Sequence, residues 1–225
     1  FDYVNLHWYF IYQNNSLALD VAKKFDLGVF IISPTDKGGH LYSPTASLIE
    51  SCAPFHPIVF NDLFCLRDNR VHTISVGLSK VKELDLHLEA IDLLEEADQI
   101  VPQIEARLNN AAIKSLGKEW LSSWSQGLPH WGNTPGKMNL PILLWLHNLV
   151  EAWDMSEYAK TRYGLLGNGG HWFPGANADC LDKEISEESL KSVLVNSPWF
   201  NEIPDLLRNL RNKLGGEIQH RLSDT

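Results

Sequence analysis

Two glycine-containing turns carry the residue types that bind anions. The first, Ser33 to Gly39, follows the apolar run Val29 to Ile32 and reads Ser-Pro-Thr-Asp-Lys-Gly-Gly, so that Lys37 adds a positive charge. The second, Gly77 to Lys80, follows the run Val71 to Val76. Glycine lets backbone amides approach a ligand, successive amides form a concave donor site, and a helix start favours negative charge. The sequence therefore predicts a phosphate-binding rim made of these two turns.

Both turns also have an ordinary structural interpretation. The segment from Ser33 to Gly39 is equally typical of a plain connection between a strand and a loop. Ser79 is equally typical of the N-cap of a helix, with Lys80 as a solvated side chain. The residue types alone leave both interpretations open.

The elements around these turns predict an α/β fold with parallel strands. Residues 1–10 and 29–32 have the apolar character of buried strands, and residues 16–25 between them have that of a helix. Strand, helix and strand in this order form the parallel crossover unit. A third strand is expected at 71–76 and a helix from Ser79. Because barrels and open sheets bind ligands at the carboxyl ends of parallel strands, both turns are expected at one edge.

The order of these segments resembles the last three strands of an aldo/keto reductase. The residues that carry the resemblance are Asp2 to Trp8, Gly28 to Gly39, Thr73 to Ser79, and Glu83-Leu84. They are similar to the family's aromatic residue that ends strand six, its Pro-x-x-x-Gly turn after strand seven, and its Gly-x-Ser start of the final helix. The resemblance covers about residues 1–95. It implies the C-terminal part of a (β/α)8 TIM barrel, about its last three strands, followed by a mostly helical extension.

This resemblance implies an NADP(H)-dependent oxidoreductase that transfers a hydride to or from a small carbonyl or alcohol substrate. Trp8 would stack on the nicotinamide, although a tryptophan in the barrel wall is the alternative and Tyr9 lies beside it. The other cofactor-binding residues that the resemblance implies are Ser33, Pro34, Thr35, Gly38, Gly39, Gly77, Ser79 and Lys80. Two positions depart from the family pattern, since Glu83 replaces a Gln and His87 replaces an Asn. Glu83 would place a carboxylate near a phosphate.

The family's catalytic Asp, Tyr, Lys and His belong to earlier strands, so no catalytic residue is assigned in this chain. Residue 1 is Phe and begins a strand-like segment, and we interpret the chain as the C-terminal piece of a longer protein. Such a piece is expected to be inactive alone. The alternative hypothesis is a non-catalytic member of the same fold that binds a nucleotide or another protein.

We interpret residues 1–98 as the barrel part and residues 99–225 as a helical extension. The extension resembles the C-terminal iron–sulfur region of a subgroup of aldo/keto reductases at Asn139-Leu140-Pro141, Arg162-Tyr163 and Ala178-Asp179-Cys180. The four cysteine positions of that subgroup are occupied here by Ser125, Leu128, Trp131 and Thr134. Iron–sulfur clusters need cysteine thiolates, so no cluster is expected. The tryptophan-rich segment 120–136 instead predicts a surface for a protein partner.

Composition excludes several classes of function. The net charge of -9 argues against nucleic acid as a partner, because phosphate binding needs basic surfaces. No apolar run approaches the roughly 18 residues that a membrane span requires. Three scattered cysteines and the lack of a visible signal peptide predict a reducing, cytoplasmic setting. No two of the nine histidines lie within five residues of each other, so no metal site is predicted.

Overall fold

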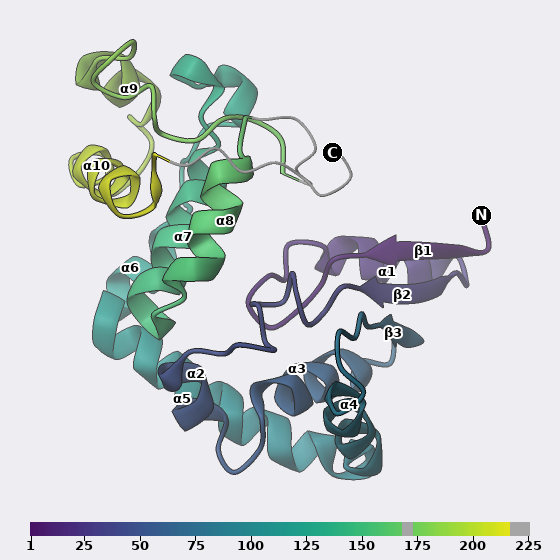
Figure 1. The fold of residues 1–225 in the computed structure, drawn as a ribbon. Helices are drawn as coiled ribbons and strands as arrows, with labels where there is room; N and C mark the ends of the chain where they lie inside the picture. Colours follow the sequence, from purple (N-terminus) through teal and green to yellow (C-terminus); the bar gives the residue numbers. More distant parts are fainter. Residues whose placement is uncertain (168–172, 217–225) are drawn as a thin grey trace. The chain divides into compact units, whose positions relative to one another are not determined.

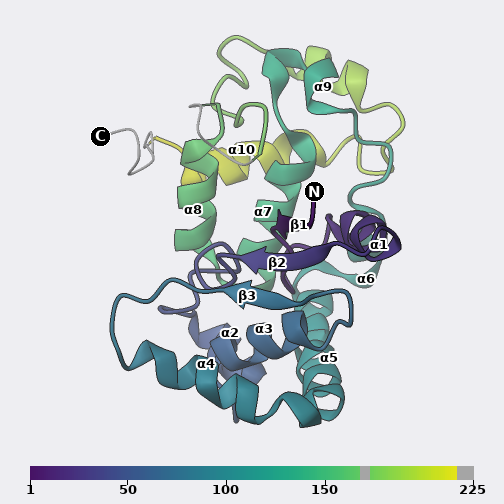
Figure 2. The same ribbon diagram turned by 90° about the vertical axis from the view of Figure 1, so that its right-hand side faces the viewer.

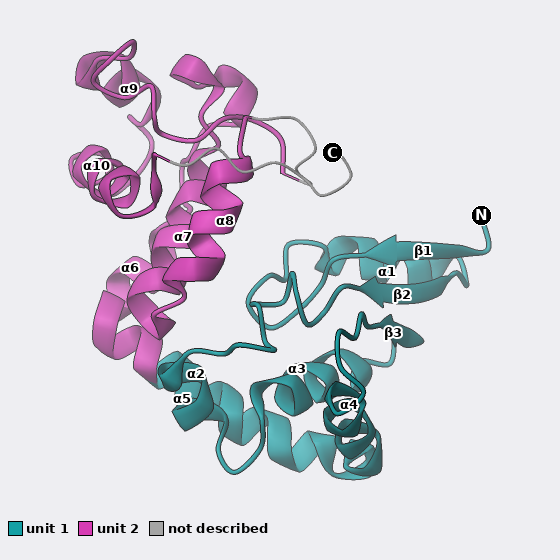
Figure 3. Cartoon of the chain, viewed as in Figure 1, with its two compact units in different colours: residues 1–110 teal, residues 111–225 magenta. Residues whose placement is uncertain are grey.

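The computed structural model describes residues 1–167 and 173–216 (Figure 1). The chain forms two compact units, residues 1–110 and 111–225 (Figure 3). Helix α5 (Ala97–Leu116) contains the boundary between them, and the predicted boundary at residue 98 falls inside the first turn of this helix. A long helix was not predicted here.

Unit 1 contains a parallel sheet of three strands in the order β1-β2-β3 (Figure 2). The strands are β1 (Tyr3–Leu6), β2 (Gly28–Ile32) and β3 (Thr73–Ser75), and α1 (Ser16–Lys24) makes the crossover from β1 to β2. The predicted α/β class with parallel strands is therefore confirmed. Strand β1 is shorter than predicted, because Tyr9 and Tyr12 exchange two backbone hydrogen bonds that turn the chain away from the sheet.

The two faces of this sheet differ in exposure. Val29 and Ile31 of β2 are fully buried, whereas Phe30 between them is 37% exposed. Its ring lies 5.1 Å from that of Tyr3, which is also exposed. Since successive side chains of a strand point to opposite faces, the helices cover the face of Val29 and Ile31. Within the described residues the opposite face is open.

Four more helices complete unit 1. They are α2 (Ala46–Cys52), α3 (Pro57–Leu66), α4 (Glu83–Asp92) and most of α5. The short α2 was not predicted, although the side chain of Thr45 caps it by accepting a hydrogen bond from the amide of Leu48. Helix α3 is almost wholly buried, as its apolar sequence predicts. Helix α4 begins at Glu83, so the prediction of Ser79 as its N-cap was wrong.

Unit 2 is mostly helical, as predicted for the extension. Its helices are α6 (Lys118–Ser123), α7 (Leu140–Trp153), α8 (Ser156–Leu165), α9 (Glu187–Val193) and α10 (Ile203–Leu214). Helices α7, α8 and α10 pack against one another and bury the leucines of α7. Asp154 adopts a left-handed conformation (φ 56°) that ends α7 and separates it from α8. The side chain of Ser186 caps α9 by accepting a hydrogen bond from the amide of Ser189.

In residues 1–167 and 173–216, no helix combines the length and apolar character needed to cross a bilayer.

Candidate functional site

The two predicted turns lie next to each other at the carboxyl edge of the sheet. Ser33 directly follows β2, and its amide donates a hydrogen bond to the carbonyl of Ser75 in β3 (3.1 Å). The hydroxyl of Tyr42, from the loop after β2, donates to the carbonyl of Gly77 (2.8 Å). Hydrogen bonds thus join the two loops. Parallel pairing places both at the edge where open sheets and barrels bind ligands.

The first turn is compact and largely internal. Pro34, Thr35, Gly38 and Gly39 are buried, and the carbonyl of Pro34 accepts a hydrogen bond from Asn61 of α3 (3.1 Å). A Cβ atom at Gly38 would lie 1.8 Å from that carbonyl oxygen, so only glycine fits there. The predicted residues of this turn therefore shape the loop. Asp36 is the exposed residue of this turn, and Ser33 and Lys37 are half-buried.

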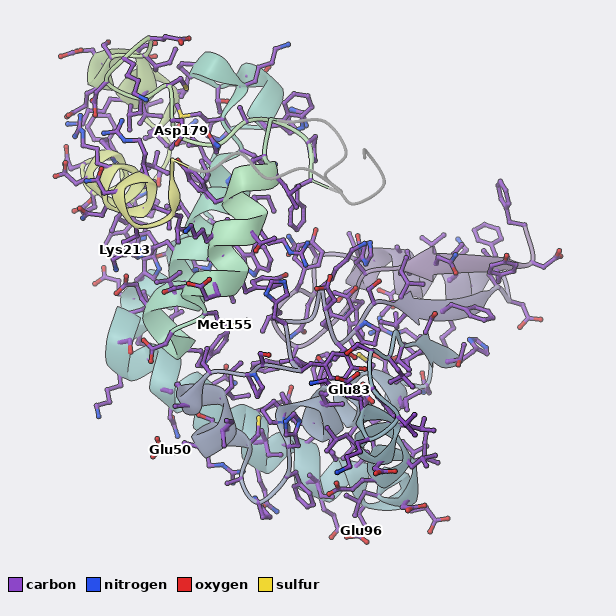
Figure 4. All side chains as sticks on the ribbon, in the orientation of Figure 1. Glu50, Glu83, Glu96, Met155, Asp179 and Lys213 are labelled. Atoms are coloured by element: carbon purple, nitrogen blue, oxygen red, sulfur yellow. The ribbon has the colours of Figure 1, made fainter. Side chains whose placement is uncertain are left out.

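The second turn is exposed and already holds a carboxylate. The Oε2 atom of Glu83 accepts hydrogen bonds from the amides of Ser79 (2.7 Å) and Lys80 (3.0 Å), and Oε1 accepts one from the Ser79 hydroxyl (3.0 Å). Desolvation acts to raise the pKa of Glu83, but these hydrogen bonds and the nearby Lys80 charge hold the pKa below its ordinary value. Glu83 stands at the start of α4 (Figure 4). The amides and the hydroxyl of this turn thus bind an anion, which in this structure is the carboxylate of Glu83.

Trp8 does not lie open at this edge. It is 5% exposed, and its ring stacks on Phe64 of α3 with centroids 4.8 Å apart. The guanidinium of Arg70 lies 5.9 Å from the ring centroid, and the indole NH donates to the Ser16 hydroxyl (3.0 Å). This packing leaves little of the Trp8 ring open to a nicotinamide. The alternative interpretation of Trp8 as a wall residue fits this geometry.

His7 is the side chain after β1 that meets the first turn. Its Nε2 atom lies 3.2 Å from the Lys37 ammonium, which can only donate, so Nε2 accepts and the ring proton resides on Nδ1. Nδ1 then donates to the Tyr9 oxygen (2.6 Å), and the Tyr9 hydroxyl donates to the Ile32 carbonyl. These contacts link Lys37 of the first turn through His7 and Tyr9 to β2.

A second chain of polar groups begins at Tyr42. Because the single Tyr42 proton is donated to Gly77, the contact of 3.0 Å between the Tyr42 oxygen and His87 Nε2 requires a proton on Nε2. The other ring nitrogen, Nδ1, lies 2.5 Å from Oδ2 of Asp62 in α3. That contact holds one proton. Burial raises the pKa of Asp62, and the hydrogen bond to His87 acts in the opposite direction.

The Asp62 carboxylate has an unusual environment. Its residue is 1% exposed, and its second oxygen, Oδ1, has no hydrogen-bond partner among the described residues. The buried hydroxyl of Thr35 in the first turn also has none in this part of the chain. Buried polar atoms are almost always hydrogen-bonded, and unpaired ones recur at functional sites. Tyr42, His87 and Asp62 form the arrangement of a proton relay, which could donate a proton to a ligand at the rim or take one from it.

Sequence reasoning found His87 only as a departure from a pattern, and it missed Tyr42 and Asp62. A signal for Asp62 was present, because a lone carboxylate inside the apolar segment Pro57 to Leu66 is buried only with a partner. Nothing in the sequence pairs Tyr42 with His87, which are 45 positions apart.

In unit 2, the positions predicted to replace cluster cysteines serve the local fold. The Thr134 hydroxyl lies 2.7 Å from the carbonyl oxygens of both Trp131 and Met138. A Cβ atom at Gly136 would lie 2.8 Å from the Cys180 sulfur, so this thiol packs against the loop. Among residues 1–167 and 173–216, no group of three or more His, Cys, Asp or Glu is arranged to hold a metal ion.

The three tryptophans of segment 120–136 differ in exposure. Trp120 is buried, and Trp124 and Trp131 are half-buried. The predicted contact with a protein partner depends on exposed indole rings, and Trp120 is buried.

No protein-family model, no curated protein and no solved structure matches this chain. A proposal for the function therefore rests on the geometry of the two joined turns.

Proposed function

We propose that this chain supplies the dinucleotide-binding rim of an oxidoreductase of the aldo/keto reductase type. The observation that carries the proposal is the joining of the two turns at adjacent strand ends, where the amides of Ser79 and Lys80 already bind a carboxylate. The cofactor is NADP(H), and the substrate is a small carbonyl compound that receives the hydride. Lys80 and Ser79 hold the 2′-phosphate, and the turn from Ser33 to Gly39 lies along the pyrophosphate.

The exposed apolar surfaces of unit 1 support a closed (β/α)8 barrel as the larger architecture. Leu17, Val21 and Phe25 form an exposed apolar stripe at and just beyond α1, the helix that crosses from β1, at one end of the sheet order, to β2. Leu84, Leu88 and Ile91 form a second such stripe on α4, which follows β3 at the other end. In a barrel, flanking helices cover both stripes, and side chains of the other strands fill the open sheet face.

Two changes to the expected cofactor contacts follow from the geometry. The nicotinamide does not use Trp8, whose ring is enclosed by Phe64 and Arg70. His7, which follows β1 at the same edge, contacts Lys37 of the first turn (3.2 Å) and would lie beside the nicotinamide in place of Trp8. Tyr42, backed by His87 and Asp62, supplies an exchangeable proton at the rim.

A non-catalytic nucleotide-binding or protein-interaction member of this fold is the second candidate. The observation that favours it is Glu83, whose carboxylate occupies the amides that a phosphate needs. The two candidates share the binding rim and differ in whether hydride transfer takes place.

Binding of the dinucleotide tests the shared part of the proposal. The protein is titrated with NADPH and with NADH, and energy transfer from tryptophan to the reduced nicotinamide is followed. We expect Lys80→Ala to weaken NADPH binding by at least about threefold and to leave NADH unchanged, because only NADPH carries the 2′-phosphate. Lys82→Ala is the matched control, since Lys82 is an exposed lysine of the same segment. If neither NADPH nor NADH binds at about millimolar concentration, the proposal is contradicted.

A further inference from the structure

Unit 2 contains a pocket of about 510 Å³ that no part of the proposed function uses. Its walls come from the junction of α5 and α6, from α7, and from the segment that leads into α10. The side chains that define its character are Trp120, His147, Trp199, Glu119, Glu151 and Glu202. Pockets of this size hold small organic ligands.

Aromatic rings form one part of the wall and are fixed in position. The Trp120 ring meets that of Trp199 at 62° with centroids 5.1 Å apart, and it meets His147 at 83° and 5.8 Å. The indole NH of Trp120 donates to Asn148 (2.6 Å), and that of Trp199 donates to Ser123 (3.0 Å). Edge-to-face packing and these hydrogen bonds hold the rings without any ligand. Trp199 is half-buried, so part of this residue stays accessible to a ligand.

The charged groups of the pocket are mainly acidic. Glu151 is neutralised by Lys213 of α10, whose ammonium lies 2.5 Å from it. Both Glu119 and Glu202 line the pocket, and neither side chain forms an ion pair or hydrogen bond within residues 1–167 and 173–216. Lys118 is the remaining cation in the lining. Burial lowers the pKa of His147, so this imidazole adds no positive charge at neutral pH.

We propose that this pocket binds a small organic cation, such as a quaternary ammonium ion or a protonated alkylamine. Ring faces attract cations through their quadrupole, and carboxylates at the rim add Coulomb attraction. The same carboxylates repel anionic ligands. A divalent metal ion is a poor alternative, because it needs a cluster of oxygen ligands and the described residues form none. The proposal is independent of the dinucleotide rim in unit 1.

Choline and its neutral carbon isostere, 3,3-dimethyl-1-butanol, test the proposal directly. The two probes have the same shape and differ in charge. We expect choline to bind at least about tenfold more tightly in isothermal titration calorimetry, since the isostere keeps the apolar contacts and loses the cation–π and charge terms. Equal binding of the two probes, or no binding of choline, overturns the proposal.

Substitutions then assign the binding to this pocket. Trp199→Leu and Glu202→Gln are each expected to weaken choline binding by at least about threefold. Glu188→Gln, which changes an exposed carboxylate of α9 outside the lining, is expected to leave it unchanged. Glu202 is exposed, so its variant keeps the fold even if Trp199→Leu does not. Unchanged choline affinity in Glu202→Gln contradicts the assignment, as does an equal loss in Glu188→Gln.

Discussion

The carboxylate of Glu83 lies 2.7 Å from the amide nitrogen of Ser79, in the position that an incoming phosphate would take. Desolvation opposes ionisation of Glu83, but the amide and hydroxyl donors outweigh it and keep the pKa low. At neutral pH the site therefore carries its own negative charge. Any phosphate that binds here must displace or protonate this carboxylate.

Glu83→Gln is accordingly expected to raise the affinity for NADPH relative to NADH. The glutamine can still accept hydrogen bonds from the amides, but it no longer repels the 2′-phosphate. We expect at least about a threefold gain for NADPH in the same fluorescence titration. Asp85→Asn, at an exposed acidic position in the first turn of α4, is the control for general charge. A loss of NADPH affinity in Glu83→Gln would show that the carboxylate does not compete with the phosphate.

Trp8→Ala is expected to destabilise the fold rather than to change a binding surface. The substitution removes a buried ring that stacks on Phe64 and donates to Ser16. Truncation of a buried tryptophan to alanine lowers the free energy of unfolding by about 3–5 kcal/mol. Urea unfolding measures this change, and Trp8→Phe should lose less because it keeps the aromatic contact. A stable Trp8→Ala protein would mean that the ring is not part of the core.

His87→Ala is expected to lower the free energy of unfolding by about 3 kcal/mol, because it leaves Asp62 buried without its partner. The double variant Asp62→Asn/His87→Ala should recover part of this loss, since an amide is cheaper to bury than a carboxyl group that ionises. A double-mutant cycle from urea unfolding gives the coupling energy. Additive effects of the two substitutions would contradict a direct interaction.

The same pair predicts a dependence of stability on pH. Burial raises the pKa of Asp62 above its ordinary value of 3.8, so the folded protein keeps this proton at pH values where the unfolded chain has released it. The contribution of Asp62 to the free energy of unfolding therefore falls as pH rises from 3.8 to the folded-state pKa, and is constant above it. Asp62→Asn should abolish this fall. Urea unfolding of both proteins at several pH values above about 4 measures it. A parallel pH profile in the two proteins would contradict the assignment.

Alanine substitutions at two glycines of unit 2 distinguish the energetic cost of backbone strain from that of a steric clash. Both Gly117 (φ 83°) and Gly127 (φ 70°) have a positive φ, but a Cβ atom at Gly117 meets open space and one at Gly127 lies 2.0 Å from the Asn196 carbonyl oxygen. Gly117→Ala is expected to lower stability by about 1–3 kcal/mol, which is the cost of backbone strain alone. Gly127→Ala should lower it by more than about 3 kcal/mol, because the backbone of the 196–197 segment must move. Thermal or urea unfolding distinguishes the two. An equal loss of stability in both variants would show that the loop at Asn196 moves aside at no cost in free energy.

The sequence determined the order and type of most elements, because short-range patterns carry this information. The apolar runs around Val29 and Ile74 predicted parallel strands, and the helix predicted from Ser79 corresponds to α4. The same patterns located both turns of the rim. Element ends were less accurate, as at Ser79, which lies four positions before the first residue of α4.

Only the tertiary structure decided what each polar side chain meets. Trp8 and His7 are neighbours in sequence, yet one packs beneath Arg70 and the other meets Lys37, because successive side chains leave opposite faces of the chain. Asp62 and His87 form a pair across 25 positions, and Trp120 and Trp199 meet from segments still farther apart. Such contacts depend on how helices pack, which is a property of the whole fold. Local sequence patterns cannot encode which distant partner a buried charge or ring will find.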